Sequence, residues 1–137
     1  MNNDKNVNVT CDPIVPLEQF IEDDRGIIKS LISFDRLKVQ SALIIESLKG
    51  SIRANHYHKQ DWHYCYVISG SIEYYERKVG DNSDPILSII KTGEMFYTGP
   101  MVEHAMVFPE DTIFLTLAGG TRSQKDYEAD LVRVKLV

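Results

Sequence analysis

The 137-residue sequence has few cysteines and no long apolar run. Two cysteines, Cys11 and Cys65, are too few for a disulfide framework. We expect both to be free thiols, with Cys65 a small core residue of a strand. No stretch approaches the roughly 18 apolar residues of a membrane-spanning helix. The polar residues 1–6 also lack the apolar segment of a signal peptide. These absences predict a cytoplasmic protein with no membrane partner.

An excess of positive charge is also missing. Fifteen Lys and Arg residues stand against twenty Asp and Glu residues, which gives a formal net charge of −5. Nucleic-acid backbones and acidic membrane surfaces are bound by basic protein surfaces. Neither is therefore an expected partner. The pair Gly119-Gly120 is a loop without the spacing or the lysine of a phosphate-binding glycine motif.

The sequence is rich in short β-branched and aromatic segments that turn residues separate. Strands are predicted at 27–32, 39–46, 64–67, 72–75, 86–90, 95–98, 105–108, 113–117 and 131–136. Residues 69–71, Ser-Gly-Ser, predict a tight hairpin, and residues 16–21 predict one helical turn that begins at a proline. No helical pattern is long enough for a β-α-β fold.

This pattern predicts one all-β domain, a sandwich or barrel, that spans residues 1–137. An apolar share of 43% is enough for a single core. We expect residues 1–15 to form a loose N-terminal segment. The barrel itself is expected over about residues 26–137.

All four histidines fall at positions from which they can meet. His56 and His58 are two residues apart, so they share one face of a strand. His63 follows a predicted turn at 59–61, and His104 opens a later strand. Neutral imidazole is a good ligand for zinc, nickel, copper and iron. Three interpretations stay open: a metal site, an acid and base pair without metal, and unrelated surface or core histidines.

The histidine spacing resembles the first cupin motif, G-x5-H-x-H-x3,4-E-x6-G. It is matched by Gly50, His56, His58, His63 and Gly70, with histidine in place of the usual glutamate. Residues 93–104 match the second motif, G-x5-P-x-G-x2-H, more loosely, because the proline is shifted by one place and a methionine replaces a glycine.

This resemblance implies a small jelly-roll β-barrel with at most short helical turns. It also implies one divalent transition metal (Zn, Ni, Fe, Mn or Cu) held by His56, His58, His63 and His104. The histidine at position 63 lowers the negative charge of the site and leaves the identity of the metal open. Cupins commonly pair through edge strands, so a homodimer is expected, and the last predicted strand is a candidate for such pairing.

Residues 53–59, Arg-Ala-Asn-His-Tyr-His-Lys, resemble the Arg-x-x-His-x-His-Lys segment of the nucleotide-sugar 3,4-ketoisomerases. They also resemble the Arg-Gly-Leu-His-Tyr segment of the dTDP-4-dehydrorhamnose 3,5-epimerases. Residues 100–106 resemble a second ketoisomerase segment, Pro-Pro-x-Val-x-His-x-Met. The resemblance implies a small-molecule substrate, a nucleotide-linked keto sugar, and an isomerase or epimerase of deoxysugar or surface polysaccharide biosynthesis.

The same resemblance implies roles for individual residues. His56 matches the epimerase base, and His56 with His58 matches the ketoisomerase pair that moves protons on the sugar. Arg53 matches a residue that contacts the phosphates. The substrate-binding candidates are two cations and two aromatic residues: Arg53, Lys59, Tyr97 and Trp62.

Departures from both families keep alternatives open. The ketoisomerases carry glutamine at the position of His63, which is consistent with metal-free chemistry, whereas the extra histidine here restores a full ligand set. A metal-dependent cupin of another class, such as a dioxygenase, and a non-catalytic cupin that binds a small molecule are the alternatives. The epimerases' aspartate partner of the base is not identifiable in the sequence. Glu73 and Glu76 are expected to face solvent.

Overall fold

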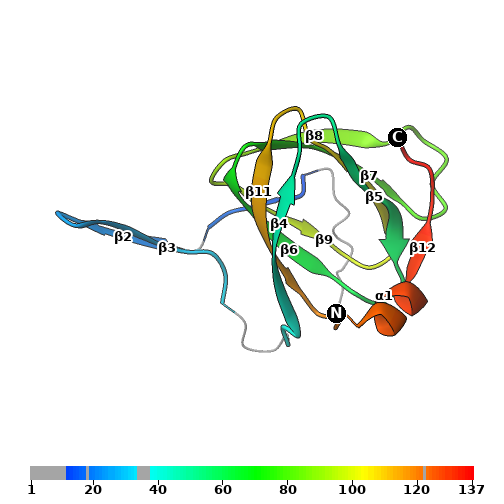
Figure 1. Ribbon diagram of the computed structural model, residues 1–137, viewed down its shortest axis with the longest axis horizontal. Coiled ribbons are helices and arrows are strands. Elements are labelled where there is room, and N and C mark those ends of the chain that lie inside the picture. Colours follow the sequence, from blue (N-terminus) through cyan, green and yellow to red (C-terminus); the bar gives the residue numbers. More distant parts are fainter. Residues whose placement is uncertain (1–11, 18, 34–37, 122) are drawn as a thin grey trace, which may run out of the picture.

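The computed structural model describes residues 12–17, 19–33, 38–121 and 123–137, so Cys11 lies outside the described residues. Two five-stranded antiparallel sheets face each other, and a two-stranded hairpin projects away from them (Figure 1). The first sheet, in spatial order, contains β1 (Ile14–Val15), β9 (Met95–Thr98), β6 (His63–Ser69), β11 (Thr112–Ala118) and β4 (Ser41–Ser47). The second contains β12 (Leu131–Arg133), β5 (Ile52–His58), β10 (Val102–Val107), β7 (Ser71–Lys78) and β8 (Ile86–Lys91). The predicted all-β jelly roll is confirmed.

The space between the two sheets is divided into an apolar zone and a polar zone. On β6, the inward residues Cys65 and Val67 belong to the apolar core, and His63 on the same face begins the polar zone. Strand β7 shows the same division, because Ile72 and Tyr74 are core residues and the next inward side chain is a glutamate. The expectation that Cys65 is a buried strand residue is confirmed. Its Sγ atom lies 3.3 Å from the Thr116 hydroxyl.

Aromatic contacts join the two sheets through the apolar zone. The rings of Tyr74 and Phe96 lie 4.9 Å apart, and those of Phe108 and Phe114 lie 5.8 Å apart. All four side chains are essentially inaccessible to solvent. Burial of side chains of this size contributes about 1.5–3 kcal/mol each to folding stability. The apolar zone therefore offsets the cost of burying polar groups in the polar zone.

The predicted hairpin at Ser69-Gly70-Ser71 is wrong. Strand β6 pairs with β9 and β11, whereas β7 pairs with β8 and β10, so the chain passes from one sheet to the other at Gly70. Strands that are separated by a tight turn need not pair when each has a better partner across its own sheet. The left-handed backbone of Gly70 (φ 91°) makes this sharp crossing possible.

The N-terminal part also differs from the prediction. The helical turn expected at 16–21 is wrong, because β2 (Gln19–Asp23) pairs with β3 (Gly26–Ser30) as a hairpin. The apolar residues of both strands favour extended pairing, and a single proline at position 16 is too weak a signal to start a helix against it. Residues 14–15, placed by the sequence in a loose segment, form β1 and pair with β9. Strand β3 lies in the projecting hairpin, not in the two-sheet body (Figure 1).

The one described helix, α1 (Gln124–Asp130), lies between β11 and β12 and begins at the cap residue Ser123, whose hydroxyl accepts a hydrogen bond from the Asp126 amide. It covers one end of the jelly roll (Figure 1). Among the described residues, no helix is both long and apolar enough to cross a membrane.

We predict that Gly70→Ala destabilises the protein by about 3 kcal/mol or more. A Cβ atom at this position would lie 2.5 Å from the Asp111 carbonyl oxygen and 2.7 Å from the Thr112 Cα. Gly80 has the same φ of 91° but open space around it, so Gly80→Ala should cost only about 1 kcal/mol of backbone strain. Urea unfolding of both variants tests this, and equal losses would contradict the crossing assigned to Gly70.

Candidate functional site

A row of inward polar side chains crosses three neighbouring strands. His104 on β10 pairs in register with His56 on β5 and, on its other side, with Glu76 on β7. Residues in register on adjacent strands lie about 5 Å apart and share a face. All three are buried, with 3–7% of their surface exposed. The expectation that Glu76 faces solvent is therefore wrong, because it follows Ile72 and Tyr74 on the inward face of β7.

The four histidine rings gather at this end of the interior. The ring centre of His56 lies 4.7 Å from that of His58 and 4.8 Å from that of His104. His63 comes from the opposite sheet, and its ring centre lies 4.7 Å from that of His58. Strands of both sheets thus bring three histidines of residues 56–63 together with the distant His104.

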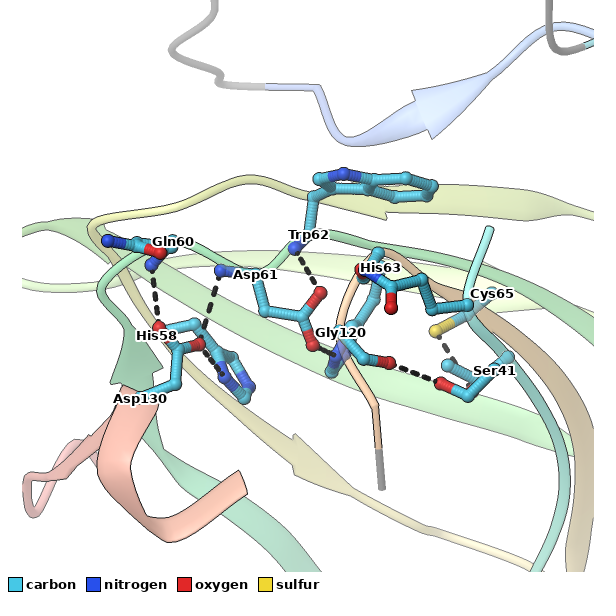
Figure 2. Close-up of polar contacts among 12 residues, drawn as sticks. Ser41, His58, Gln60, Asp61, Trp62, His63, Cys65, Gly120 and Asp130 are labelled. Carbon is cyan, nitrogen blue, oxygen red and sulfur yellow. Dashed lines mark hydrogen bonds and ion pairs between the residues drawn. The ribbon is translucent and has the colours of Figure 1, made fainter. Parts of the chain in front are cut away.

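Asp130, the last residue of α1, holds His58 and the turn that follows it (Figure 2). Its Oδ2 atom lies 3.1 Å from His58 Nδ1 and also accepts a hydrogen bond from the Asp61 amide, while Oδ1 accepts one from the Gln60 amide. With Nδ1–H donating to this carboxylate, the lone pair of His58 is on Nε2. That atom is buried and has no hydrogen-bond partner among the described residues.

Asp61 holds the second histidine in a similar way. Its Oδ2 atom lies 3.0 Å from His63 Nε2, and its Oδ1 atom accepts a hydrogen bond from the Trp62 amide (Figure 2). Burial by itself raises the pKa of Asp61, but the hydrogen bond and the charge of His63 outweigh burial, and the pKa is lowered. Each of the two histidines therefore has its own carboxylate.

The environment keeps the central imidazoles neutral near pH 7. Burial, followed by the neighbouring His63, lowers the pKa of His58, and Asp61 and Asp130 oppose this only in part. Burial and the proximity of His56 lower the pKa of His104 well below its usual value. Burial raises the pKa of Glu76 to about 7, with a further contribution from Asp12. Neutral imidazoles can accept protons or bind metals.

A bulge in β5 sets the position of Arg53. Ala54 and Asn55 have left-handed backbones, and the register with β10 shifts between them and His56. The extra residue places Arg53, which is exposed, in register with Met106. The Arg53 guanidinium reaches the opposite sheet, donating to the Ser47 hydroxyl at 2.6 Å and to the carbonyl oxygen of residue 46 at 3.0 Å.

The remaining predicted substrate-binding residues lie outside this interior. Trp62 lines a cavity of about 420 Å³ at the rim, together with Asp61, Asp126, Tyr127 and Asp130 among others. Its indole lies so close to Gly119 that a Cβ atom there would overlap it. Tyr97 packs against Tyr64 on the outer face, with ring centres 4.7 Å apart. Lys59 is exposed, and its backbone amide donates to the Asp130 carbonyl.

The histidines offer a set of atoms that fits a divalent metal. His56, His58 and His104 each present one ring nitrogen within 4.8 Å of the others, and His58, Asp61 and His63 form a second such group. His104 Nδ1 lies 2.9 Å from the Val102 carbonyl oxygen, to which it can donate, so its Nε2 is available as a ligand. His58 Nε2, buried and without a partner, has the same capacity.

Three residues of the site were not identified from the sequence: Asp61, Asp130 and Glu76. From the sequence, Asp61 lies in a predicted turn, and Asp130 directly precedes a predicted strand. The Ser123-x-x-Asp126 pattern was a usable sign of the short helix that ends at Asp130. For Glu76, extending the alternation of Ile72 and Tyr74 by two residues gives the inward face directly.

Comparison with solved structures identifies similar folds. A 3,4-ketoisomerase from Helicobacter canadensis matches with a TM-score of 0.71 and 18% identity, over 88% of each chain. A variant of the 3,4-ketoisomerase from Thermoanaerobacterium thermosaccharolyticum, in complex with TDP-4-keto-6-deoxyglucose, matches with a TM-score of 0.67 and 19% identity over 88% of this chain and 87% of that one. The dTDP-4-dehydrorhamnose 3,5-epimerase from Sulfolobus tokodaii matches with a TM-score of 0.66 and 16% identity, over 88% and 81%.

No family model matches the sequence, and no curated protein matches it. The chain therefore has the fold of the RmlC-like ketoisomerases and epimerases, as the sequence resemblance implied. At identities of 16–19%, this likeness establishes the fold and leaves the activity to be argued from the site.

Proposed function

We propose that this protein is an isomerase or epimerase that moves protons on a nucleotide-linked keto sugar. The proposal is carried by the environment of the His58 imidazole. The ring is buried, its pKa is lowered, and Asp130 holds its Nδ1 so that the unpartnered Nε2 faces the interior. This is the arrangement that a general base needs. Similar folds act on such sugars, which supports the choice of substrate.

The chemistry requires only a base, an acid and a polarised carbonyl. A keto group acidifies the neighbouring C–H, so His58 Nε2 removes that proton and an enediol forms. If a proton returns to the former carbonyl carbon, the keto group moves to the neighbouring position. If it returns to the carbon that lost it, from the opposite face, the configuration of that carbon is inverted. His56, whose ring centre lies 4.7 Å from that of His58, is the proposed acid. No oxidant is consumed in either reaction.

Asp130 is a positioning residue in this scheme. Its carboxylate fixes the tautomer of His58 and stabilises the imidazolium that forms after proton transfer. It also raises the pKa of His58, although burial and His63 still lower that pKa overall. Asp130 therefore makes the imidazole a stronger base than burial alone would leave it.

Arg53 and Lys59 are the candidate cations for the diphosphate, one near each end of β5. An arginine binds phosphate through paired, charge-assisted hydrogen bonds, and Arg53 is exposed near the start of β5, three residues before His56. The net charge of −5 gives an anionic ligand no general attraction, so local cations must supply it. Trp62 and Tyr97 remain predicted stacking residues, of which Trp62 alone lines the rim cavity.

The proposal is tested with TDP-4-keto-6-deoxyglucose in D2O. We expect deuterium to enter the sugar, detected by mass spectrometry and NMR, and His58→Asn to reduce the rate by about 10²–10⁴-fold. Asp130→Asn should slow exchange and shift the acid limb of the pH profile to lower pH, because the carboxylate that raises the pKa of His58 is removed.

Glu128→Gln is the matched control, since Glu128 lies on the same helix and pairs with Arg133 on the surface. It should leave the rate and the pH profile unchanged. Absence of exchange and of product across several TDP-4-keto-6-deoxy sugars would refute the proposed function.

A metal-dependent cupin, such as a dioxygenase, is the second candidate, and the ligand atoms of His56, His58 and His104 favour it. A bound Zn, Ni, Fe, Mn or Cu ion would polarise a substrate oxygen. The same ion would occupy the lone pair of His58 that a base requires. The two candidates therefore predict opposite effects of metal removal.

If the site binds metal, protein purified without a chelator should contain about one ion per chain, and His104→Ala should lose it. Elemental analysis measures this directly. Less than about 0.1 ion per chain, with no increase after loading, would refute the metal site. Deuterium exchange that survives chelation would support His58 as a free base, whereas exchange that needs the metal would contradict that role.

We propose that the expected homodimer forms through the projecting hairpin. Its large apolar side chains are about half exposed or more: Phe20, Ile21, Ile27 and Ile28. An isolated two-stranded hairpin is only marginally stable. On a second copy, edge strand β8 has exposed apolar residues, with Leu87 and Ile89 on its outer face and Ile86 at its start. Strand β12 pairs with β5 within its own chain.

Light scattering should give twice the chain mass of 15.7 kDa. Ile21→Asp combined with Ile28→Asp should give the monomer, because charges would replace the apolar contact. Asp23→Asn, at the polar turn of the same hairpin, should leave the dimer intact. A wild-type monomer, or a dimer that survives the double substitution, would contradict this interface.

A further inference from the structure

Glu76 is placed in the polar zone by backbone register alone. Strands β5, β10 and β7 are neighbours, and His56, His104 and Glu76 occupy one row across them. The side chain is 5% exposed. On the same face, the Tyr74 hydroxyl forms a hydrogen bond of 2.6 Å with the Thr98 hydroxyl. The nearest inward polar group on the strand therefore already has a partner.

One oxygen of Glu76 is not satisfied. Its Oε2 is buried and has no hydrogen-bond partner among the described residues, and it shares this property only with His58 Nε2. Leaving a buried polar atom unpaired destabilises the folded protein, and more so when the group is charged. A leucine or methionine would fill such a position without this cost. His58 lies on β5 and Glu76 on β7, and between these strands lies His104 on β10, whose ring centre is 5.8 Å from that of His58.

We propose that Glu76 contacts the bound sugar, and that its Oε2 shares a hydrogen bond with a hydroxyl or keto oxygen of the sugar ring. This inference rests on the proposed function and extends it. It assigns the sugar, not the nucleotide, to the end of the interior that holds the row of His56, His104 and Glu76. Glu76 becomes a specificity residue that selects ligands with an oxygen substituent facing β7, because a ligand without one leaves this carboxyl group unpaired.

The test compares the apparent Kd values of TDP and TDP-4-keto-6-deoxyglucose by calorimetry, with Glu76→Leu, Glu76→Gln and wild type. Glu76→Leu should weaken binding of the sugar nucleotide by about 10–100-fold and leave binding of TDP within about twofold. Its ligand-free thermal midpoint should rise, because the unpaired oxygen is gone. Glu76→Gln, which has nearly the same shape, should lose less affinity than Glu76→Leu and guards against misfolding of the leucine variant.

Glu73→Leu is the matched control, since Glu73 lies on the same strand with its side chain on the opposite face. It should change neither Kd. If both Glu76 variants bind the sugar nucleotide as tightly as wild type, the contact is refuted while the proposed function stands. If wild type binds neither TDP nor the sugar nucleotide, the proposed function is refuted, and the contact assigned to Glu76 fails with it.

Discussion

The carboxylate of Asp130 is the contact on which the geometry of the histidine end depends. Its two oxygens accept hydrogen bonds from the amides of residues 60 and 61 and from His58 Nδ1. One side chain thereby fixes the end of α1, the turn after β5 and the orientation of an imidazole. The turn then presents Asp61 to His63. An acidic residue at the C-terminal end of a helix is electrostatically unfavourable, and here these donors offset that cost.

The polar zone lowers the folding stability of the protein. Two buried imidazoles have lowered pKa values, and two buried polar atoms, on His58 and Glu76, have no partner among the described residues. None of this improves folding, and an apolar row in the same place would improve it. The aromatic contacts around Phe96, Phe108 and Phe114 compensate at the other end of the interior. Groups held in an environment that costs stability are the expected mark of a functional site.

The sequence predicted local patterns well, but it did not predict which strands pair or which distant side chains make contact. Alternation placed His56 and His58 on one face, and the turn before His63 was found, so the histidine cluster was predictable. Strand pairing was not, because the Ser69-Gly70-Ser71 turn has the same composition whether its strands pair or part. The pairing of His58 with Asp130 joins residues 72 positions apart, and no local signal specifies such a contact. Glu76 was misassigned by its charge, although its position in the strand indicated the correct face.

The distribution of charge also bears on the orientation in which the proposed sugar nucleotide binds. The described lining of the rim cavity contains the carboxylates of Asp61, Asp126 and Asp130, and a diphosphate would be repelled there. Arg53, near the other end of β5, is exposed, and its guanidinium donates to the Ser47 hydroxyl of the opposite sheet, away from these carboxylates. Phosphates at Arg53 and phosphates at Lys59 therefore correspond to opposite orientations of a sugar nucleotide along β5. Only a diphosphate at Lys59 has to compete with the acidic rim, so the charge of the rim favours one orientation of the ligand even though the net charge of the protein gives it no attraction.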